Sequence, residues 1–234
     1  MLIKQYIKMY SLEFLRNKSA VFFTIMFPSI LLLLFSRSLP SAPEARWFML
    51  ASVINYGVQS AMFQTMGMGI AFSRQKKWID YLTFLPVSNA YTIWGRVLSM
   101  LIVAFVSIIF VVLVGMFSLS IQFTFSAVGI MLFVGLLGGI PMGLLASYLG
   151  NMINAHTARS AFVIINLLLF FAAFSLPDKG WLAIFKTFIP SYQWLSISYG
   201  WAIEHAINYF CLFGFIGYTM TFYFLASYGN KKST

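Results

Sequence analysis

The sequence predicts an all-α integral membrane protein, and its composition and length both point to that class. Hydrophobic residues make up 61% of the 234 positions, and charged residues make up only 9%. A soluble domain carries about 45–50% apolar and about 25% charged residues, so this chain has too few polar groups to cover a water-exposed surface. Disordered chains are poor in apolar residues, which excludes that class as well. A span needs about 20 mostly apolar residues, so the length fits one domain, residues 1–234, with six spans and short loops.

Residues 1–18 have an amphipathic pattern. Apolar side chains recur at helical spacing, and basic side chains fall mainly on the opposite face. The apolar positions are Ile3, Tyr6, Ile7, Tyr10 and Phe14, and the opposite ones are Lys4, Lys8, Ser11 and Lys18. We predict an interfacial helix that lies in the headgroup layer of the membrane. The alternative is a plain basic flank before the first span.

Six apolar stretches are predicted to cross the membrane, at about 19–39, 46–72, 96–117, 124–149, 160–176 and 206–227. The first stretch also fits a signal peptide, but the long charged segment before it, which includes Glu13, and the lack of a clear cleavage site favour a span. Residues 177–205 are rich in Trp and Tyr and are interrupted by Pro and Gly. Because Trp and Tyr favour membrane interfaces, we predict re-entrant helices on the outer side there.

The basic residues predict the orientation of the spans. With the N-terminus inside, eleven of the 15 Lys and Arg residues fall in inner segments, namely Lys4, Lys8, Arg16, Lys18, Arg74, Lys76, Lys77, Arg96, Arg159, Lys231 and Lys232. The outer segments hold Arg37, Arg46, Lys179 and Lys186. Cytoplasmic loops of membrane proteins collect Lys and Arg, so both termini are predicted to be cytoplasmic. This bias explains the net charge of +10 without a nucleic-acid partner.

Groups that catalyse reactions or bind metals are scarce. The carboxylates are Glu13, Glu44, Asp80, Asp178 and Glu204, all near span ends or in loops, which argues against a proton relay inside the membrane. The two histidines lie on opposite sides of the predicted topology, so no metal site is expected. The C-terminal tail lacks the spacing of a phosphate-binding loop. We therefore expect no catalytic site and no bound cofactor in this chain.

The loop 73–95 combines a basic cluster with a short amphipathic helix. Trp78, Leu82 and Leu85 lie at helical spacing, and the helix is expected to end near Pro86, because proline disfavours helix in the residue before it. Ser88 can cap the next helix. Such a helix suits docking into a groove of a partner protein. The alternative is a helix that rests on the membrane surface.

This loop resembles that of the type-2 export permeases of ATP-binding-cassette transporters, with the pattern R-E-x-G-T-L-E-x-L-x-x-x-P-V-S-x-x-x-x-x-x-G-K. The positions that match or nearly match are Arg74, Leu82, Pro86, Val87, Ser88, Gly95 and Arg96. Asp80 stands where the pattern has its second Glu. Gln75 and Lys77-Trp78 depart from the pattern. The N-terminal helix is similar to the connecting helix of this family. The segment Ile189-Pro190-Ser191-Tyr192 resembles its proline-aromatic turn before the last span.

The resemblance implies the membrane half of an exporter in a bacterial plasma membrane. A separate cytosolic ATPase subunit would hold ATP and Mg²⁺, and two permease chains, identical or different, would form the path. The residues that would contact the ATPase are Arg74, Lys76, Lys77, Trp78, Ile79, Asp80, Leu82, Leu85 and Pro86. Alternatives are a secondary transporter driven by an ion gradient and, less favoured, a membrane-embedded enzyme.

Polar residues share one face of the second span. Ser52, Asn55 and Gln59 lie on it, and Met62 and Met66 continue it. They suit a substrate path with adaptable Met side chains; the alternative is hydrogen bonding between helices. The resemblance implies that the second and fifth spans line the cavity, which adds Asn166. The 26 Phe and 13 Met residues suit a hydrophobic or amphipathic cargo, but lipid-facing helices are also rich in Phe.

Small residues recur every four positions on the fourth span, at Gly135, Gly139, Gly143 and Ser147. This spacing allows close approach of two helices. We expect packing within one chain rather than a dimer seam, because the resemblance places that seam on the first and fifth spans.

Overall fold

The computed structural model describes residues 2–38, 40, 42–75, 89–119, 121–176 and 180–233, and every regular element among them is a helix. The elements are α1 (Leu2–Arg16), α2 (Lys18–Val21), η1 (Phe22–Met26), α3 (Phe27–Ser36), α4 (Pro43–Ser60), η2 (Ala61–Gly67), α5 (Met68–Gln75), α7 (Asn89–Ser118), α8 (Phe125–Met152), α9 (Ala155–Ser175), α10 (Trp181–Thr187), α11 (Pro190–Tyr199), η3 (Gly200–Glu204) and α12 (Tyr209–Ser233). The all-α prediction is confirmed for these residues.

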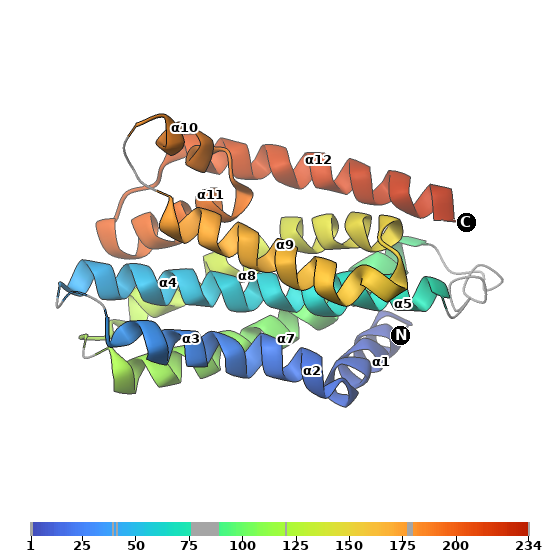
Figure 1. Cartoon of the computed structure of the whole chain (residues 1–234), viewed down its shortest axis with the longest axis horizontal. Helices are drawn as coiled ribbons and strands as arrows, with labels where there is room; N and C mark the ends of the chain where they lie inside the picture. The colour runs from blue at the N-terminus through green and yellow to red at the C-terminus, as the bar shows by residue number, and fades with distance from the viewer. Residues whose placement is uncertain are drawn as a thin grey trace.

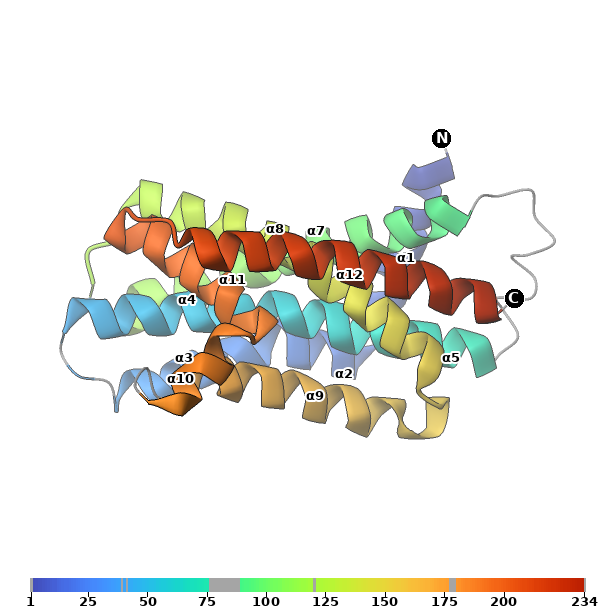
Figure 2. The same ribbon diagram turned by 90° about the horizontal axis from the view of Figure 1, so that it is seen from above.

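The long helices run side by side along one axis, and both termini lie at the same end of the bundle (Figures 1 and 2). Within the described ranges, five helices are long and apolar enough to cross a membrane: Lys18–Ser36, Trp94–Ser118, Phe125–Met152, Ala155–Ser175 and Tyr209–Gly229. They correspond to the predicted first, third, fourth, fifth and sixth spans. The chain is therefore a multi-pass membrane protein by length and composition of its helices.

The second predicted span, 46–72, forms the central helix of the bundle and is not one of those five. It runs without a break from α4 through η2 to α5, between α3 and α9 in Figure 1. Every residue from Met49 to Gln64 is buried. Because neighbouring helices cover this segment on all sides, its side chains need not be apolar to face lipid, and it can carry polar groups such as Gln59 and Gln64.

The small residues of α8 pack against the central helix and α7. A methyl group added to Gly139 would lie 3.0 Å from side-chain atoms of Val58, Met62 and Leu101. One added to Gly143 would lie 3.1 Å from the sulfur of Met62. The third glycine, Gly135, faces Ile54 and Ile108, and Ser147 is buried. These neighbours lie on the central helix and on α7.

The segment η2 is a π-helical turn within the central helix. Thr65 lies in it and donates a hydrogen bond from its hydroxyl to the backbone carbonyl of Ala61. Such bonds bend helices, and π turns rotate the side chains that follow them relative to an α-helical register. Close by, a methyl group added to Gly67 would lie 2.5 Å from the ring of Phe162 on α9. Glycine at this position therefore allows Phe162 of α9 to pack directly on the central helix.

The N-terminal helix α1 is inclined to the bundle axis in Figure 2 and packs on α7. Tyr10 and Phe14 of this helix are buried. Lys8 and Arg16 are exposed, and so are Leu12 and Leu15. A mixed basic and apolar outer face is typical of helices in a headgroup layer.

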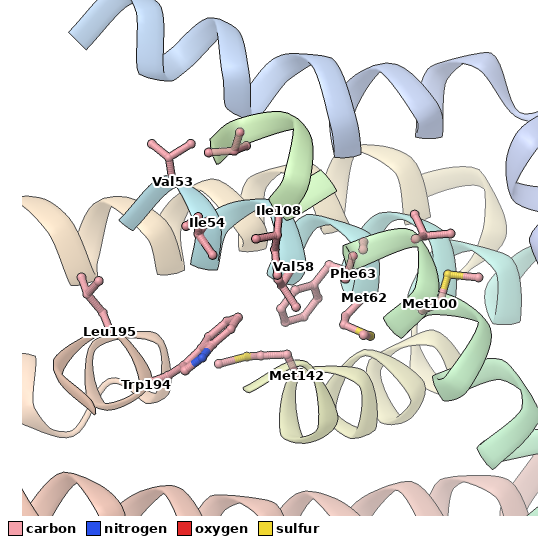
Figure 3. Packing of buried hydrophobic residues seen from close by; sticks show 14 of the residues in the cluster. Val53, Ile54, Val58, Met62, Phe63, Met100, Ile108, Met142, Trp194 and Leu195 are labelled. Carbon is pink, nitrogen blue, oxygen red and sulfur yellow. The ribbon is translucent and has the colours of Figure 1, made fainter. Parts of the chain in front are cut away.

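The predicted re-entrant region, 177–205, contains α10, α11 and η3. Helix α10 exposes Trp181 and Phe185, as an interfacial helix would. Helix α11, in contrast, enters the core rather than staying at the interface. Its Trp194 is fully buried and donates a hydrogen bond from its indole N–H to the carbonyl of Val134, 2.9 Å away. Figure 3 shows that the indole points toward Met142 of α8 and lies near buried side chains of the central helix.

Candidate functional site

A buried polar cluster joins the central helix to α9 and α11. The side-chain amide of Gln59 donates a hydrogen bond to the Asn166 side-chain oxygen at 2.8 Å and contacts its backbone carbonyl at 3.0 Å. The hydroxyl of Ser191 donates to the amide oxygen of Gln59 at 2.7 Å. All three side chains are buried. Gln59 and Asn166, two of the residues predicted for the substrate path, are thus in direct contact.

Asn55 lies one helical turn before Gln59, and its side chain makes no hydrogen bond within the described structure. Both the oxygen and the nitrogen of its amide are buried and lack a partner. The amide nitrogen of Asn166 lacks one too. Buried polar atoms nearly always have partners, so unpaired ones indicate water or a ligand. Ser52, a further predicted residue, donates to the carbonyl of Phe48 at 2.8 Å.

A small cavity lies beside these polar groups. It has room for about one water molecule, and it is lined by Ser52, Asn55, Tyr56, Gln59, Phe170, Ala173, Phe174, Ser191 and Leu195. The predicted path residues Met62 and Met66 point elsewhere, since both pack against Gly143 of α8. The π turn η2 explains the difference, because it breaks the α-helical register that would keep them on the face of Asn55.

Aromatic rings continue from the cavity toward the end of the bundle opposite the termini. The ring centres of Tyr56 and Phe170 are 4.9 Å apart, and those of Phe170 and Phe174 are 5.8 Å apart. Beyond them, Phe48 meets Tyr199 edge to face at 5.4 Å. Such pairs are worth about 0.5–1.5 kcal/mol beyond the area they bury. The cavity is therefore lined by both polar side chains and aromatic rings.

Two carboxylates influence the pKa of Tyr199, the last aromatic residue of this series. Burial raises the pKa of the Tyr199 phenol, and the negative charges of Glu204 and Glu44 raise it further. A phenol is protonated at neutral pH even at its ordinary pKa of about 10, so the raised pKa only extends the pH range in which the Tyr199 hydroxyl can donate a hydrogen bond. Glu44 and Glu204 are far apart in sequence, so their influence on one phenol was not predictable from either segment alone.

Most of the residues predicted to contact an ATPase lie outside the described residues: Lys76, Lys77, Trp78, Ile79, Asp80, Leu82, Leu85 and Pro86. Arg74 is described, and it lies in the last turn of α5. Its guanidinium donates a hydrogen bond to the backbone carbonyl of Asn151 in α8. Gln75 lies 3.3 Å from a ring nitrogen of His156. The end of the central helix is thus joined to the turn between α8 and α9.

Gly95 and Arg96, the last two positions of the loop pattern, join α7 to α1. A methyl group added to Gly95 would lie 2.8 Å from Cβ of Tyr6, so glycine allows this close approach. The Arg96 guanidinium stacks 4.4 Å from the centre of the Tyr10 ring and donates to its hydroxyl at 3.2 Å. The sequence indicated Arg96 as a basic residue at a span end, whereas it is almost fully buried.

Among the described residues, no group of three or more His, Cys, Asp and Glu side chains could hold a metal ion. Comparison of the chain with protein-family profiles, with curated proteins and with solved structures finds no match. The class that the structure defines is an α-helical, multi-pass membrane protein with a polar cluster buried at its centre.

Proposed function

We propose that this chain is the membrane-spanning subunit of an ATP-driven exporter for a hydrophobic or amphipathic molecule, such as a drug, an antimicrobial or toxin peptide, or a lipid-like compound. A separate ATPase subunit binds ATP and Mg²⁺ and supplies the energy. The observation that carries the proposal is the unpaired amide of Asn55 beside the Gln59 cluster. The same continuous helix leads directly into the loop that resembles an ATPase-docking segment.

In this proposal the central helix also crosses the membrane, in addition to the five helices above, and the end that holds both termini faces the cytoplasm of a bacterial cell. Two observations support that orientation. Both termini lie at the same end of the bundle, as an even number of crossings requires (Figures 1 and 2). Lys4, Lys8, Arg16, Arg74 and Arg159 all belong to segments at the end with the termini, as the positive-inside rule requires.

A second permease chain, identical or different, completes the path. One chain offers only a cavity of about one water molecule beside Asn55. Helices α3 and α9 flank the central helix on either side in Figure 1, and each exposes large apolar side chains: Leu33, Leu34, Ile164 and Leu168. A partner chain that packs on these two helices would enclose the space between the central helices of both chains.

The energy source is tested with the tagged protein extracted gently from its native host. We expect a cytosolic ATPase to co-purify in equal amount, and the complex in inside-out vesicles to accumulate a fluorescent lipophilic probe when ATP is added. Vanadate, which traps ATPases, should stop accumulation, and an uncoupler of the proton gradient should not. Accumulation that stops with the uncoupler and proceeds without the ATPase would favour an ion-gradient carrier instead.

The roles of Asn55 and Gln59 are separated by replacing each with leucine. Gln59→Leu leaves Ser191 and Asn166 without their partner and is expected to lower the free energy of unfolding by about 1 kcal/mol or more. Asn55→Leu removes an amide that has no partner, so stability should be unchanged or higher. Its ATP-driven transport should nonetheless fall at least tenfold. Wild-type transport in Asn55→Leu would show that Asn55 lies outside the path.

A further inference from the structure

A second cavity lies near the end of the bundle that holds the termini, between α1, α2, η2, α5 and α7. Its volume is about 60 Å³, which is room for a few water molecules or for one small anion. Polar side chains line one part of it: Tyr10, Glu13, Asn17, Gln64, Thr65 and Arg96. Apolar side chains, among them Phe14 and Phe72, line the rest. The cavity therefore suits a ligand that is itself amphipathic.

Arg96 is the charged group set most deeply in this cavity. Only 6% of its surface is exposed, and within the described residues its side-chain contacts are the hydroxyl and the ring of Tyr10. A methyl group added to Gly69 would lie 3.8 Å from one of its terminal nitrogens, which places the guanidinium between α1 and α5. No described carboxylate forms an ion pair with it. A buried cation without a counter-ion is costly, so an anion in the cavity would stabilise the fold.

The nearest charge of opposite sign on the cavity wall is Glu13. It is exposed, and it lies on α1 at the outer part of the cavity, whereas Arg96 lies inside. A guanidinium presents several N–H donors in a plane that matches the oxygens of a phosphate. Basic pockets between spans on the cytoplasmic side bind phosphate-bearing lipid headgroups in this way.

We propose that this cavity binds a phosphate group, supplied by the headgroup of a membrane phospholipid, with Arg96 as its counter-ion. The phosphate would contact Arg96 together with the hydroxyl of Tyr10. Glu13, at the outer part of the cavity, would face the outer part of the headgroup. A positively charged ammonium group there would form an ion pair with its carboxylate. The cavity has room for little more than the phosphate, so the glycerol and the acyl chains would extend out of it. The site requires no ATPase and no export, so it can be tested apart from the proposed function.

The test uses the full chain, purified and stripped of lipid, with lipid retention measured by native mass spectrometry. We expect a phosphatidylethanolamine to be retained and to raise the melting temperature. A diacylglycerol with the same acyl chains but no phosphate should do neither. Inorganic phosphate alone should give a much smaller shift. Equal retention of diacylglycerol, or an equal shift with inorganic phosphate, would overturn the lipid-phosphate assignment.

Two variants and one control locate the site. Arg96→Gln should lower phospholipid retention at least tenfold, whereas Arg159→Gln, which removes an exposed cation at the same end of the bundle, should not change it. Because Arg96→Gln also alters the contact with α1, Gly69→Leu provides a second variant. Its first carbon would lie 3.8 Å from a terminal nitrogen of Arg96, so the side chain would occupy the cavity beside the guanidinium, and the same loss of retention is expected. Wild-type retention in either variant would overturn the proposal.

Discussion

Replacing Trp78 or Leu82 with aspartate is expected to abolish ATP-driven export and the co-purification of the ATPase. Both residues belong to the predicted docking helix of loop 73–95, on the face that would enter a groove of the partner. Buried aromatic anchors at interfaces contribute about 2 kcal/mol or more, so the affinity for the ATPase should fall at least about 30-fold. The measurement is the amount of ATPase retained on the tagged protein, together with the rate of ATP-dependent accumulation in vesicles.

Trp181→Asp is the matched control for this prediction. It makes the same chemical change on α10, at the end of the bundle opposite the termini, where the indole is exposed. ATPase retention should stay at the wild-type level in this variant. Retention of the ATPase by Trp78→Asp and Leu82→Asp, at wild-type strength, would mean that the loop does not dock and that its helix rests on the membrane surface.

Replacing Gly138 with alanine is expected to destabilise the fold strongly. The added methyl group would overlap the indole of Trp194, which lies directly over this glycine. The indole would have to move, and its hydrogen bond to the carbonyl of Val134 would be lost. Overpacking costs about 1–3 kcal/mol and a lost hydrogen bond about 1 kcal/mol, so we expect a total near 3 kcal/mol. Thermal unfolding in mild detergent measures it.

Gly129→Ala is the control on the same helix, because a methyl group there has nothing within 4 Å. Its stability should equal or slightly exceed that of the wild type, since alanine favours helix over glycine. The double variant Gly138→Ala with Trp194→Phe should be less destabilised than the sum of the two single variants, because a smaller ring leaves room for the methyl group. Additive effects would show that the two side chains do not compete for the same space.

The amino-acid sequence predicts the helices of this fold well where each helix has a lipid-facing side. The stretch predicted at 124–149 is the helix Phe125–Met152, and the one predicted at 206–227 corresponds to Tyr209–Gly229. Long apolar runs identify such helices because lipid contact demands apolar side chains along most of their length. The prediction of six spans depends on the central helix, whose polarity follows from its enclosure by other helices.

Contacts between distant segments were not predictable in the same way. Ser191 meets Gln59 across 132 positions of the chain, and Trp194 reaches Val134 across 60. No local pattern indicates such a pairing. The prediction for Met62 and Met66 assumed an unbroken α-helical register, but both residues lie within the π-helical turn η2, where that register is broken. Local periodicity describes a helix, but the side that a residue faces also depends on irregular turns within it.

The enclosed position of the central helix has a consequence for how the protein is made. Ribosomes build the chain from its N-terminus, so α4 and η2 leave the ribosome before α9 and α11 exist. The amide of Gln59 meets its partner in α9 only after a further 107 residues have been synthesised. During that interval Asn55 and Gln59 lie on a helix that also carries apolar side chains such as Ile54. The polar groups of the central helix can therefore be paired only once α9 and α11 have been synthesised.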